Sequence, residues 1–296
     1  MEYIPARHLL HRSRSAEWVG TDHTMNLYRG CCHGCLYCDS RSDCYQIGDF
    51  DTVRAKADAL RILRDDLARK VRPAFIGMGS MSDPYNPFEK ELLLTRHALE
   101  LIDAYDCGVA IATKSDLIVR DIDILTSIQR HSPVICKLTV TTADDALAAK
   151  LEPNAPPPSA RLGALKELSG AGLFAGVLLM PVLPFLGDSD EAVLAVLEGA
   201  ARAGARFIYP AFGVTMRRGQ REYFLDGLER AFPDQGLTAR YLHQYGDRYQ
   251  CASPRARALW KVFTEACRER GILYDMRSIR RAASLGYGDR QLTFFD

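Results

Sequence analysis

The chain has 296 residues, of which 47% are hydrophobic and 25% are charged, and these are the proportions of an ordinary globular protein. Its formal net charge of +1 provides no marked basic excess, so composition does not favour a dedicated nucleic-acid binder. No apolar run approaches the roughly 20 residues that span a bilayer, and the N-terminus does not resemble a signal peptide. We therefore expect a cytoplasmic protein without membrane contact, whose nine cysteines are thiols or metal ligands rather than disulfides.

Apolar runs of strand length alternate along the chain with segments of helical period. The expected strands are residues 24–28, 74–78, 108–112, 134–140, 174–180 and 206–210. The expected helices between them are residues 52–68, 89–104, 120–129, 159–171 and 189–203. Such alternation predicts parallel strands joined by right-handed helical crossovers. Six units predict an α/β fold, a partial (β/α)6 TIM-type barrel, with its site at the carboxyl ends of the strands.

The alternating pattern ends after the sixth strand. We expect residues 1–214 to form the barrel core with an N-terminal cysteine loop, and residues 215–296 to form a helical extension that caps the barrel. Within the extension, His243, Tyr245 and Tyr249 could stack on bases, or could bury their rings against the barrel. Two arginine clusters are either solvated faces or phosphate contacts. They consist of Arg217, Arg218 and Arg221, and of Arg277, Arg280 and Arg281.

Three cysteines near the N-terminus have the spacing C-x3-C-x2-C, which is rarely met by chance in a chain of this composition. They are Cys31, Cys35 and Cys38. Three thiolates on one loop can bind three irons of a 4Fe-4S cluster and leave the fourth iron without a protein ligand. The alternatives are buried thiols without metal, or a zinc site with His33, Cys32 or Cys44 as the fourth ligand.

The cysteine motif resembles that of the radical S-adenosylmethionine (radical SAM) superfamily. In that family the cofactor's methionine group chelates the open iron, and electron transfer from the reduced cluster produces a 5′-deoxyadenosyl radical that abstracts hydrogen. The resemblance implies two cofactors, a 4Fe-4S cluster on these cysteines and S-adenosyl-L-methionine, and an electron donor such as flavodoxin or ferredoxin. It also places Tyr37, before the last cysteine, near the adenine.

Further segments resemble the spore photoproduct lyase-like branch, whose members are often described as relatives of DNA repair photolyases. They are residues 26–31, 79–85, 113–115, 151–153 and 161–162. With these segments the resemblance covers most of the span from Asn26 to about Pro210. It makes this branch the preferred placement of the chain.

Polar residues at the ends of the predicted strands are candidate cofactor ligands. Ser82 and Asp83 follow the second strand and could receive the methionine ammonium, or could form a turn that caps the next helix. Lys114 follows the third strand, where the branch resemblance places the cofactor carboxylate, although it could also be a surface charge. Thr139, in the fourth strand, offers a hydroxyl to the ribose or carboxylate, or is simply a good strand residue.

Two further residues in the resembling segments suggest a structural role. Glu152 and Arg161 are expected to form a bidentate bridge that fixes the loop after the fourth strand, since arginine is poorly suited to proton transfer. After the fifth strand, residues 180–184 read as a stiff loop near the adenine, or as core.

One position departs from spore photoproduct lyase itself, in which a cysteine returns hydrogen to the product radical. Met81 stands at that position here, and a thioether carries no hydrogen to donate. The sequence therefore predicts an enzyme other than a true spore photoproduct lyase. Its catalytic hydrogen donor is unassigned, and Cys32, Cys44 and Cys251 are each either a replacement or an inert thiol.

Two classes of function follow from these observations. The first is a radical enzyme that abstracts hydrogen from a nucleic-acid base, a peptide side chain or a small metabolite. The second is a non-catalytic module in which the cysteines hold zinc or a closed cluster and a basic face binds nucleic acid. The polar residues at successive strand ends are expected only for the enzyme, and we therefore favour the first class.

Overall fold

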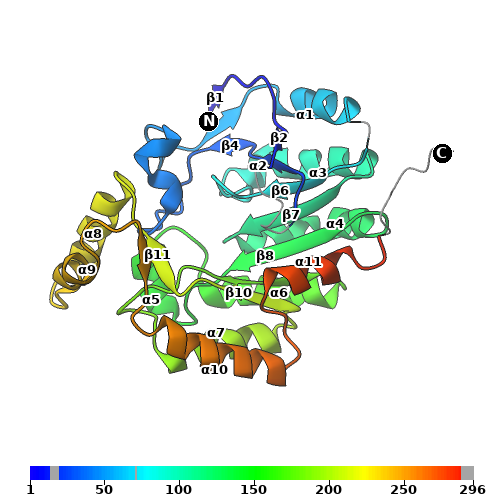
Figure 1. Ribbon diagram of the computed structural model, residues 1–296. Coiled ribbons are helices and arrows are strands. Elements are labelled where there is room, and N and C mark those ends of the chain that lie inside the picture. The colour runs from blue at the N-terminus through cyan, green and yellow to red at the C-terminus, as the bar shows by residue number, and fades with distance from the viewer. Residues whose placement is uncertain (14–19, 71, 288–296) are drawn as a thin grey trace.

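The computed structural model describes residues 1–13, 20–70 and 72–287, and its centre is a curved parallel sheet (Figure 1). The seven strands have the order β10-β9-β8-β7-β6-β3-β2, and all pairs are parallel except β2 with β3. Their bounds are β2 His11–Arg12, β3 His23–Met25, β6 Phe75–Met78, β7 Gly108–Thr113, β8 Val134–Thr139, β9 Ala175–Leu179 and β10 Phe207–Pro210. The six parallel strands confirm the predicted partial barrel.

Helices from the crossovers cover the outer face of this sheet (Figure 1). They are α1 Ala59–Ala68, α2 Glu89–Leu92, α3 Leu94–Ala104, the 3-10 helix η3 Asp116–Asp121, α4 Ile122–Gln129, α5 Asp145–Leu151, α6 Pro158–Gly170 and α7 Asp190–Arg202. The strands are continuous apolar runs because both faces of the sheet are covered. Helices cover the outer face, and side chains inside the barrel pack on the inner face. No helix in the described ranges is long and apolar enough to cross a bilayer.

Three predicted elements differ from the structure. The strand expected at 24–28 is interrupted, since β3 ends at Met25 and β4, Tyr28–Arg29, pairs in another sheet with β5, Arg54–Lys56, which also pairs with β1, Glu2–Ile4. The helix expected from residue 52 therefore begins only at Ala59, after β5. The helix expected at 89–104 divides at Leu93, whose φ of 51° is left-handed and incompatible with a continuous α-helix.

The chain after β10 continues with a second small sheet and four helices. These are β11 Gly213–Thr215, α8 Gln220–Ala231, α9 Leu237–Tyr245, β12 Gln250–Ala252, α10 Ala256–Glu269 and α11 Met276–Ser284, and β11 pairs antiparallel with β12. Figure 1 shows α8 and α9 beside the cysteine loop, and α10 beside α7. The proposed division of the chain at residue 215 stays a prediction.

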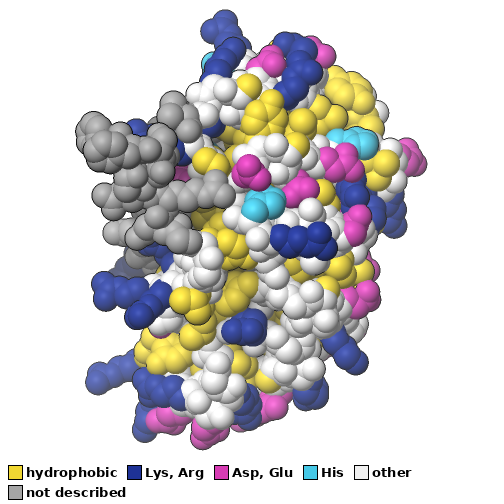
Figure 2. Space-filling model, turned by 90° about the vertical axis from the view of Figure 1, so that its right-hand side faces the viewer, with side chains coloured by type: hydrophobic (Ala, Val, Ile, Leu, Met, Phe, Trp, Pro, Cys, Tyr) yellow, Lys and Arg dark blue, Asp and Glu magenta, His cyan; other side chains and the backbone are white. Residues whose placement is uncertain are grey.

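Helix α11 closes the end of the barrel that lies opposite the cysteine loop. Ile279 and Ala283 are buried against Ala110, Ile135 and Phe207, which project inward from β7, β8 and β10. The lumen therefore has an apolar floor at the amino ends of the strands. The face shown in Figure 2 carries lysine and arginine side chains mixed with aspartate and glutamate.

The aromatic residues of the extension differ in burial, and stacking on bases stays a prediction for the exposed ones. Tyr245 is buried and its hydroxyl donates to the carbonyl of Ala252 at 2.7 Å, so it packs within the extension. Tyr249 is 40% exposed, and its hydroxyl accepts from Arg217 at 2.6 Å. His243 is exposed on α9. The first arginine cluster thus has at least one partner within the chain.

Candidate active site

The cysteine loop runs from β4 to the 3-10 helix η1, Asp39–Arg41, and its backbone is bound to two distant segments. Cys31 N–H donates to the carbonyl of Phe50 at 2.8 Å, and Leu36 N–H donates to that of Leu151 at 2.9 Å. Gly30 has a φ of 82°, and a Cβ there would lie 2.8 Å from the carbonyl oxygen of Phe50. Only glycine fits this position without displacing backbone.

One small cavity at the carboxyl ends of the strands gathers the predicted metal residues and all of the predicted cofactor residues except Tyr37, which lines a neighbouring cavity. Its volume is about 130 Å³, and we call it the cluster cavity. Its lining includes Cys31, Cys35, Cys38, Ser82, Asp83, Lys114 and Thr139. Segments far apart in the sequence therefore converge here, because the carboxyl ends of parallel strands lie at one edge of the sheet. The binding roles of these residues stay predictions.

The spacing of the three thiols bears on the kind of metal site that they could form. In the described ranges, no group of three His, Cys, Asp or Glu side chains is close enough together to hold one ion. A cluster needs its thiolates spread around a cube of iron and sulfur, whereas zinc needs them to converge on one point.

Burial makes the thiols dependent on a metal for their ionisation. It raises the pKa of Cys31 to about 12, and it also raises the pKa values of Cys35 and Cys38. Lys114 opposes this effect at Cys35 and Cys38, since its cation favours the thiolates. Iron binding must therefore displace protons from these thiols, which is the coupling expected of a thiolate-ligated site.

Asp83 joins the cysteine loop to the ends of two strands. Its carboxylate accepts hydrogen bonds from Tyr85 N–H at 2.9 Å, Thr113 Oγ1 at 2.6 Å and Lys114 N–H at 2.8 Å. Its Oδ2 also lies 3.5 Å from Nδ1 of buried His33, whose pKa burial lowers. Asp83 thus already has a structural role, and a contact with the methionine ammonium would be additional.

Ser82 is likewise engaged within the chain. Its hydroxyl donates to the carbonyl of Tyr28 at 3.0 Å, and this bond leaves the oxygen free to accept a hydrogen bond. Met81, at the position of the missing cysteine, also lines the cluster cavity, and its N–H donates to Asn26 Oδ1 at 3.3 Å.

A buried ion pair fixes the loop after β8. Glu152 and Arg161 are both fully buried and are in contact, which confirms the predicted bridge. The bridge is not bidentate, because the other arginine nitrogens donate to the carbonyls of Thr139 at 3.0 Å and Pro156 at 2.7 Å. Arg161 therefore holds the end of β8 and the loop together, and its role is structural.

Tyr37 and Lys114 extend this buried network to the cysteine loop. The Tyr37 hydroxyl donates to Glu152, and the Lys114 ammonium lies 5.4 Å from the centre of the Tyr37 ring. Burial alone would lower the pKa of Lys114, but Cys35 and Glu152 outweigh it, so the net shift is upward. Lys114 is therefore a permanent cation inside the cavity and not a surface charge.

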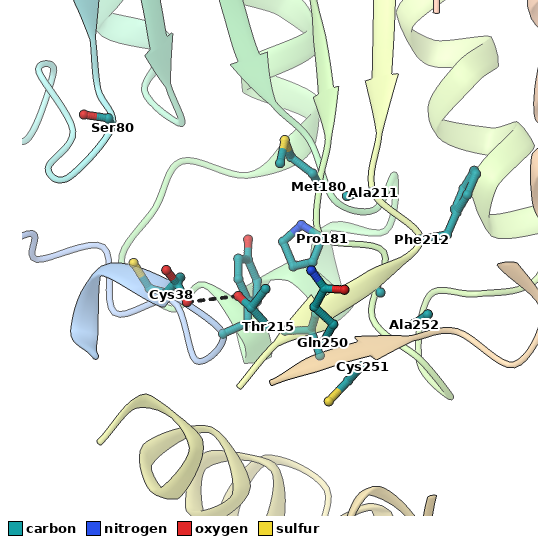
Figure 3. Close-up of a pocket in the computed structure, with 14 residues that line it drawn as sticks. Cys38, Ser80, Met180, Pro181, Ala211, Phe212, Thr215, Gln250, Cys251 and Ala252 are labelled. Atoms are coloured by element: carbon teal, nitrogen blue, oxygen red, sulfur yellow. Dashed lines mark hydrogen bonds between the residues drawn. The ribbon is translucent and has the colours of Figure 1, made fainter. Parts of the chain in front are cut away.

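A larger cavity of about 490 Å³ adjoins the cluster cavity, and Figure 3 shows its lining. We call it the outer cavity. Cys38 and Ser80 line both cavities, while Met180 and Pro181 come from the loop after β9. Tyr37 and Cys251 also line it, and the remaining lining residues were not indicated by the sequence, namely Asp39, Ala211, Phe212, Gly213, Val214, Thr215, Gln250 and Ala252. The pairing of β11 with β12 could not be predicted from the sequence, because the two strands lie some 35 residues apart.

The three candidate hydrogen donors do not present a thiol to the outer cavity. Cys251 lines it, but its side chain points away from the other labelled residues in Figure 3, and its Sγ contacts the carbonyl of Arg248 at 3.4 Å. Cys44 is exposed beside Arg217. Cys32 packs against the main core. The reading of these as inert thiols is the one that the geometry supports.

The sequence profile of the radical SAM superfamily matches residues 25–197. The chain belongs to this superfamily. The protein is therefore an enzyme, and the family match does not identify its reaction. Among its relatives, protein Rv2578c of Mycobacterium tuberculosis is 33% identical over 230 residues, which cover 75% of this chain and 67% of the relative. Protein MJ0683 of Methanocaldococcus jannaschii is 31% identical over 218 residues, covering 73% and 78%.

Solved structures show where the fold recurs. Spore photoproduct lyase in complex with a dinucleoside spore photoproduct superposes with a TM-score of 0.64 at 15% identity, covering 92% of this chain and 81% of the lyase. The radical SAM methyltransferase TsrM of Kitasatospora setae, with cobalamin and a [4Fe-4S] cluster bound, superposes with a TM-score of 0.56 at 10% identity, covering 84% and 52%. At these identities the likeness extends to the fold alone.

Proposed function

We propose that this protein is a radical SAM enzyme whose cluster binds to Cys31, Cys35 and Cys38 and whose cofactor lies in the cluster cavity. The observation that carries the proposal is the convergence of three thiols, Lys114 and Thr139 on one cavity that adjoins a larger one. When bound, the reduced cluster and S-adenosyl-L-methionine supply a 5′-deoxyadenosyl radical that abstracts hydrogen from an organic substrate.

The chain's own residues hold and orient these groups. Lys114 presents a half-buried cation to the cofactor carboxylate, and Ser82 Oγ can accept from its ammonium. The hydroxyl of Thr139, on the lumen side of β8, is available to the ribose or carboxylate. Asp83, Glu152 and Arg161 keep the strand ends and the cysteine loop in fixed relation, which is the preorganisation that a radical site needs.

The outer cavity is the proposed substrate site, and its volume lies within the range of ordinary ligand pockets. An apolar wall with the amide of Gln250 suits a flat ring that carries polar edges. We favour a nucleic-acid base, in line with the dinucleoside spore photoproduct bound by the lyase of similar fold. A peptide side chain or small metabolite is the second candidate, supported by the tryptophan substrate of TsrM.

Reduction of the cluster requires an external electron donor. We propose a flavodoxin or ferredoxin, because the donor must have a low reduction potential. We place the reaction in the cytoplasm, where thiols stay reduced.

The proposal is tested by anaerobic reconstitution with iron and sulfide, reduction with dithionite, and chromatography for 5′-deoxyadenosine after addition of S-adenosylmethionine. We expect about four irons per chain and 5′-deoxyadenosine, with both lost in Cys35→Ala. Cys44→Ala is the matched control, since Cys44 is exposed and lines neither cavity. Stable zinc binding without iron uptake would contradict the proposal.

A further inference from the structure

Lys137 is a lysine in the middle of the central parallel sheet. Its neighbours on β8 define the direction of its side chain, because successive side chains of a strand point to opposite faces. Cys136 and Leu138 pack in the main core beneath the outer helices, while Ile135 packs inside the barrel and Thr139 lines the cluster cavity. Lys137 lies between Ile135 and Thr139 on the same face, so its side chain enters the lumen.

The small side chain of Ala112 leaves space beside Lys137 on the β7 side, whereas the ring of Phe207 fills the space over Gly176 on the β9 side. Lys137 pairs in register with Ala112 on β7 and with Gly176 on β9. Ala112 itself lines the cluster cavity, so Lys137 occupies a layer that the cavity reaches. Below this layer, Ile135 and Phe207 pack against α11 and close the lumen. The direction left open to the ammonium is therefore toward the cavity.

The ammonium of Lys137 has no partner within the part of the chain that the structure describes. The side chain is only 4% exposed, yet it makes no ion pair and donates no hydrogen bond there. Burial lowers its pKa to about 8, and the one other contribution comes from Cys136. The second cation that faces this region, the half-buried Lys114, differs because the Glu152 carboxylate stabilises its charge. A buried cation without a partner lowers the stability of the folded protein, and a bound anion would offset that cost.

We propose that Lys137 binds an oxyanion of the substrate, a carboxylate or a phosphate, in the lumen beneath the cluster cavity. The inference rests on the proposed function and narrows the substrate to an anionic molecule whose charged group reaches below the cofactor. Lys114, directly after β7, and Thr139, at the end of β8, lie closer to the carboxyl ends of the strands and line the cluster cavity, and they are the proposed contacts of the cofactor itself. The two lysines thus hold two different anions at two depths.

The test is equilibrium dialysis of the anaerobically reconstituted full chain against labelled inorganic phosphate and, separately, labelled acetate, at constant ionic strength. We expect one of the two probes to bind, which distinguishes a phosphate from a carboxylate. Lys137→Met should weaken that binding by about tenfold to a hundredfold, the range for a charge-assisted hydrogen bond, and Lys137→Arg should retain most of it. The control is Lys166→Met, the same change at an exposed site on α6, and should bind as the native chain does.

Labelled S-adenosylmethionine separates the substrate's anion from that of the cofactor. We expect probe binding to persist in the presence of saturating S-adenosylmethionine. Displacement of the probe by the cofactor, together with weaker cofactor binding in Lys137→Met, would assign Lys137 to the cofactor and overturn the inference. Equal probe binding in Lys137→Met and the native chain, or no binding to the native chain, would also overturn it. Because dialysis measures no turnover, these results stand apart from whether 5′-deoxyadenosine forms.

Discussion

At the scale of single residues, the lumen contains a charge that works against folding. Lys137 keeps its proton in both folded and unfolded chains below pH 8, and the folded state then bears the full cost of burying the cation. Between about pH 8 and the ordinary value of 10.5, the unfolded chain binds more protons than the folded one. The contribution of Lys137 to the free energy of unfolding therefore rises with pH across this window.

Lys137→Met removes that cost and should stabilise the protein. We expect its free energy of unfolding to exceed that of the native chain by about 1 to 3 kcal/mol below pH 8, and the difference to shrink as pH rises to 10.5. Urea unfolding of both proteins at pH 7 and pH 10 measures it, and other titrating groups cancel in the comparison. A difference that does not depend on pH would contradict the assignment of the cost to charge.

The Glu152–Arg161 pair leads to a prediction of the opposite sign. Arg161→Met leaves a buried carboxylate without its cation and should lower the free energy of unfolding by about 3 to 5 kcal/mol. The double variant Glu152→Leu with Arg161→Met should lose less, since it buries no unpaired charge. Chemical denaturation of the single and double variants provides the comparison, and a double variant that is less stable than the single one would refute the argument.

At the scale of elements, the cysteine loop depends on backbone geometry. Gly30→Ala places a Cβ against the carbonyl of Phe50 and should prevent the loop from closing, so we expect iron content after reconstitution to fall at least severalfold. Gly48→Ala is the matched control, because Gly48 also has a positive φ, 74°, but its Cβ would meet no atom within 4 Å. It should show only the backbone strain, about 1 kcal/mol, and retain its iron. Equal iron loss in both variants would show that strain alone is responsible.

The strands and crossovers could be predicted from the sequence because period and apolarity act locally. The six parallel strands follow from apolar runs, and the cavity residues follow from their places at strand ends. The division at Leu93 could not be predicted, because residues 89–104 keep a helical period through it. Helix α9 could not be predicted either, because its many exposed polar residues obscure the buried positions Leu237, Tyr241 and Tyr245.

Pairings between distant segments account for most of what the sequence did not reveal. Asp39 accepts a hydrogen bond from Thr215 at 3.0 Å across the outer cavity wall, shown by the dashed line in Figure 3, yet the two residues are 176 positions apart. The absence of a charged partner for Lys137 among the described residues could not be predicted either, because the sequence of an apolar strand does not show which side chains will surround its lysine. Both features depend on how segments that are distant in the sequence pack together.

At the scale of the whole molecule, the barrel has a sealed end and an open one. Ile279 on α11 is 1% exposed inside the seal, so Ile279→Ala should lower the free energy of unfolding by about 2 to 4 kcal/mol. Thermal unfolding of the cluster-loaded protein measures this loss. Leu285→Ala is the control, since Leu285 is 79% exposed just beyond α11 and should change stability little. A loss as large in the control would mean that α11 is held by other contacts.

The two-stranded sheet of β11 and β12 is hydrogen-bonded as a unit separate from the seven-stranded sheet, although it forms one wall of the outer cavity. A wall built this way can change its side chains during evolution without disturbing the strands that carry the chemistry. Relatives could thus acquire new substrates by drift in this ribbon alone. For the same reason, the two-stranded sheet of β11 and β12 is a suitable target for engineering substrate specificity, with substitution libraries directed first at Gln250.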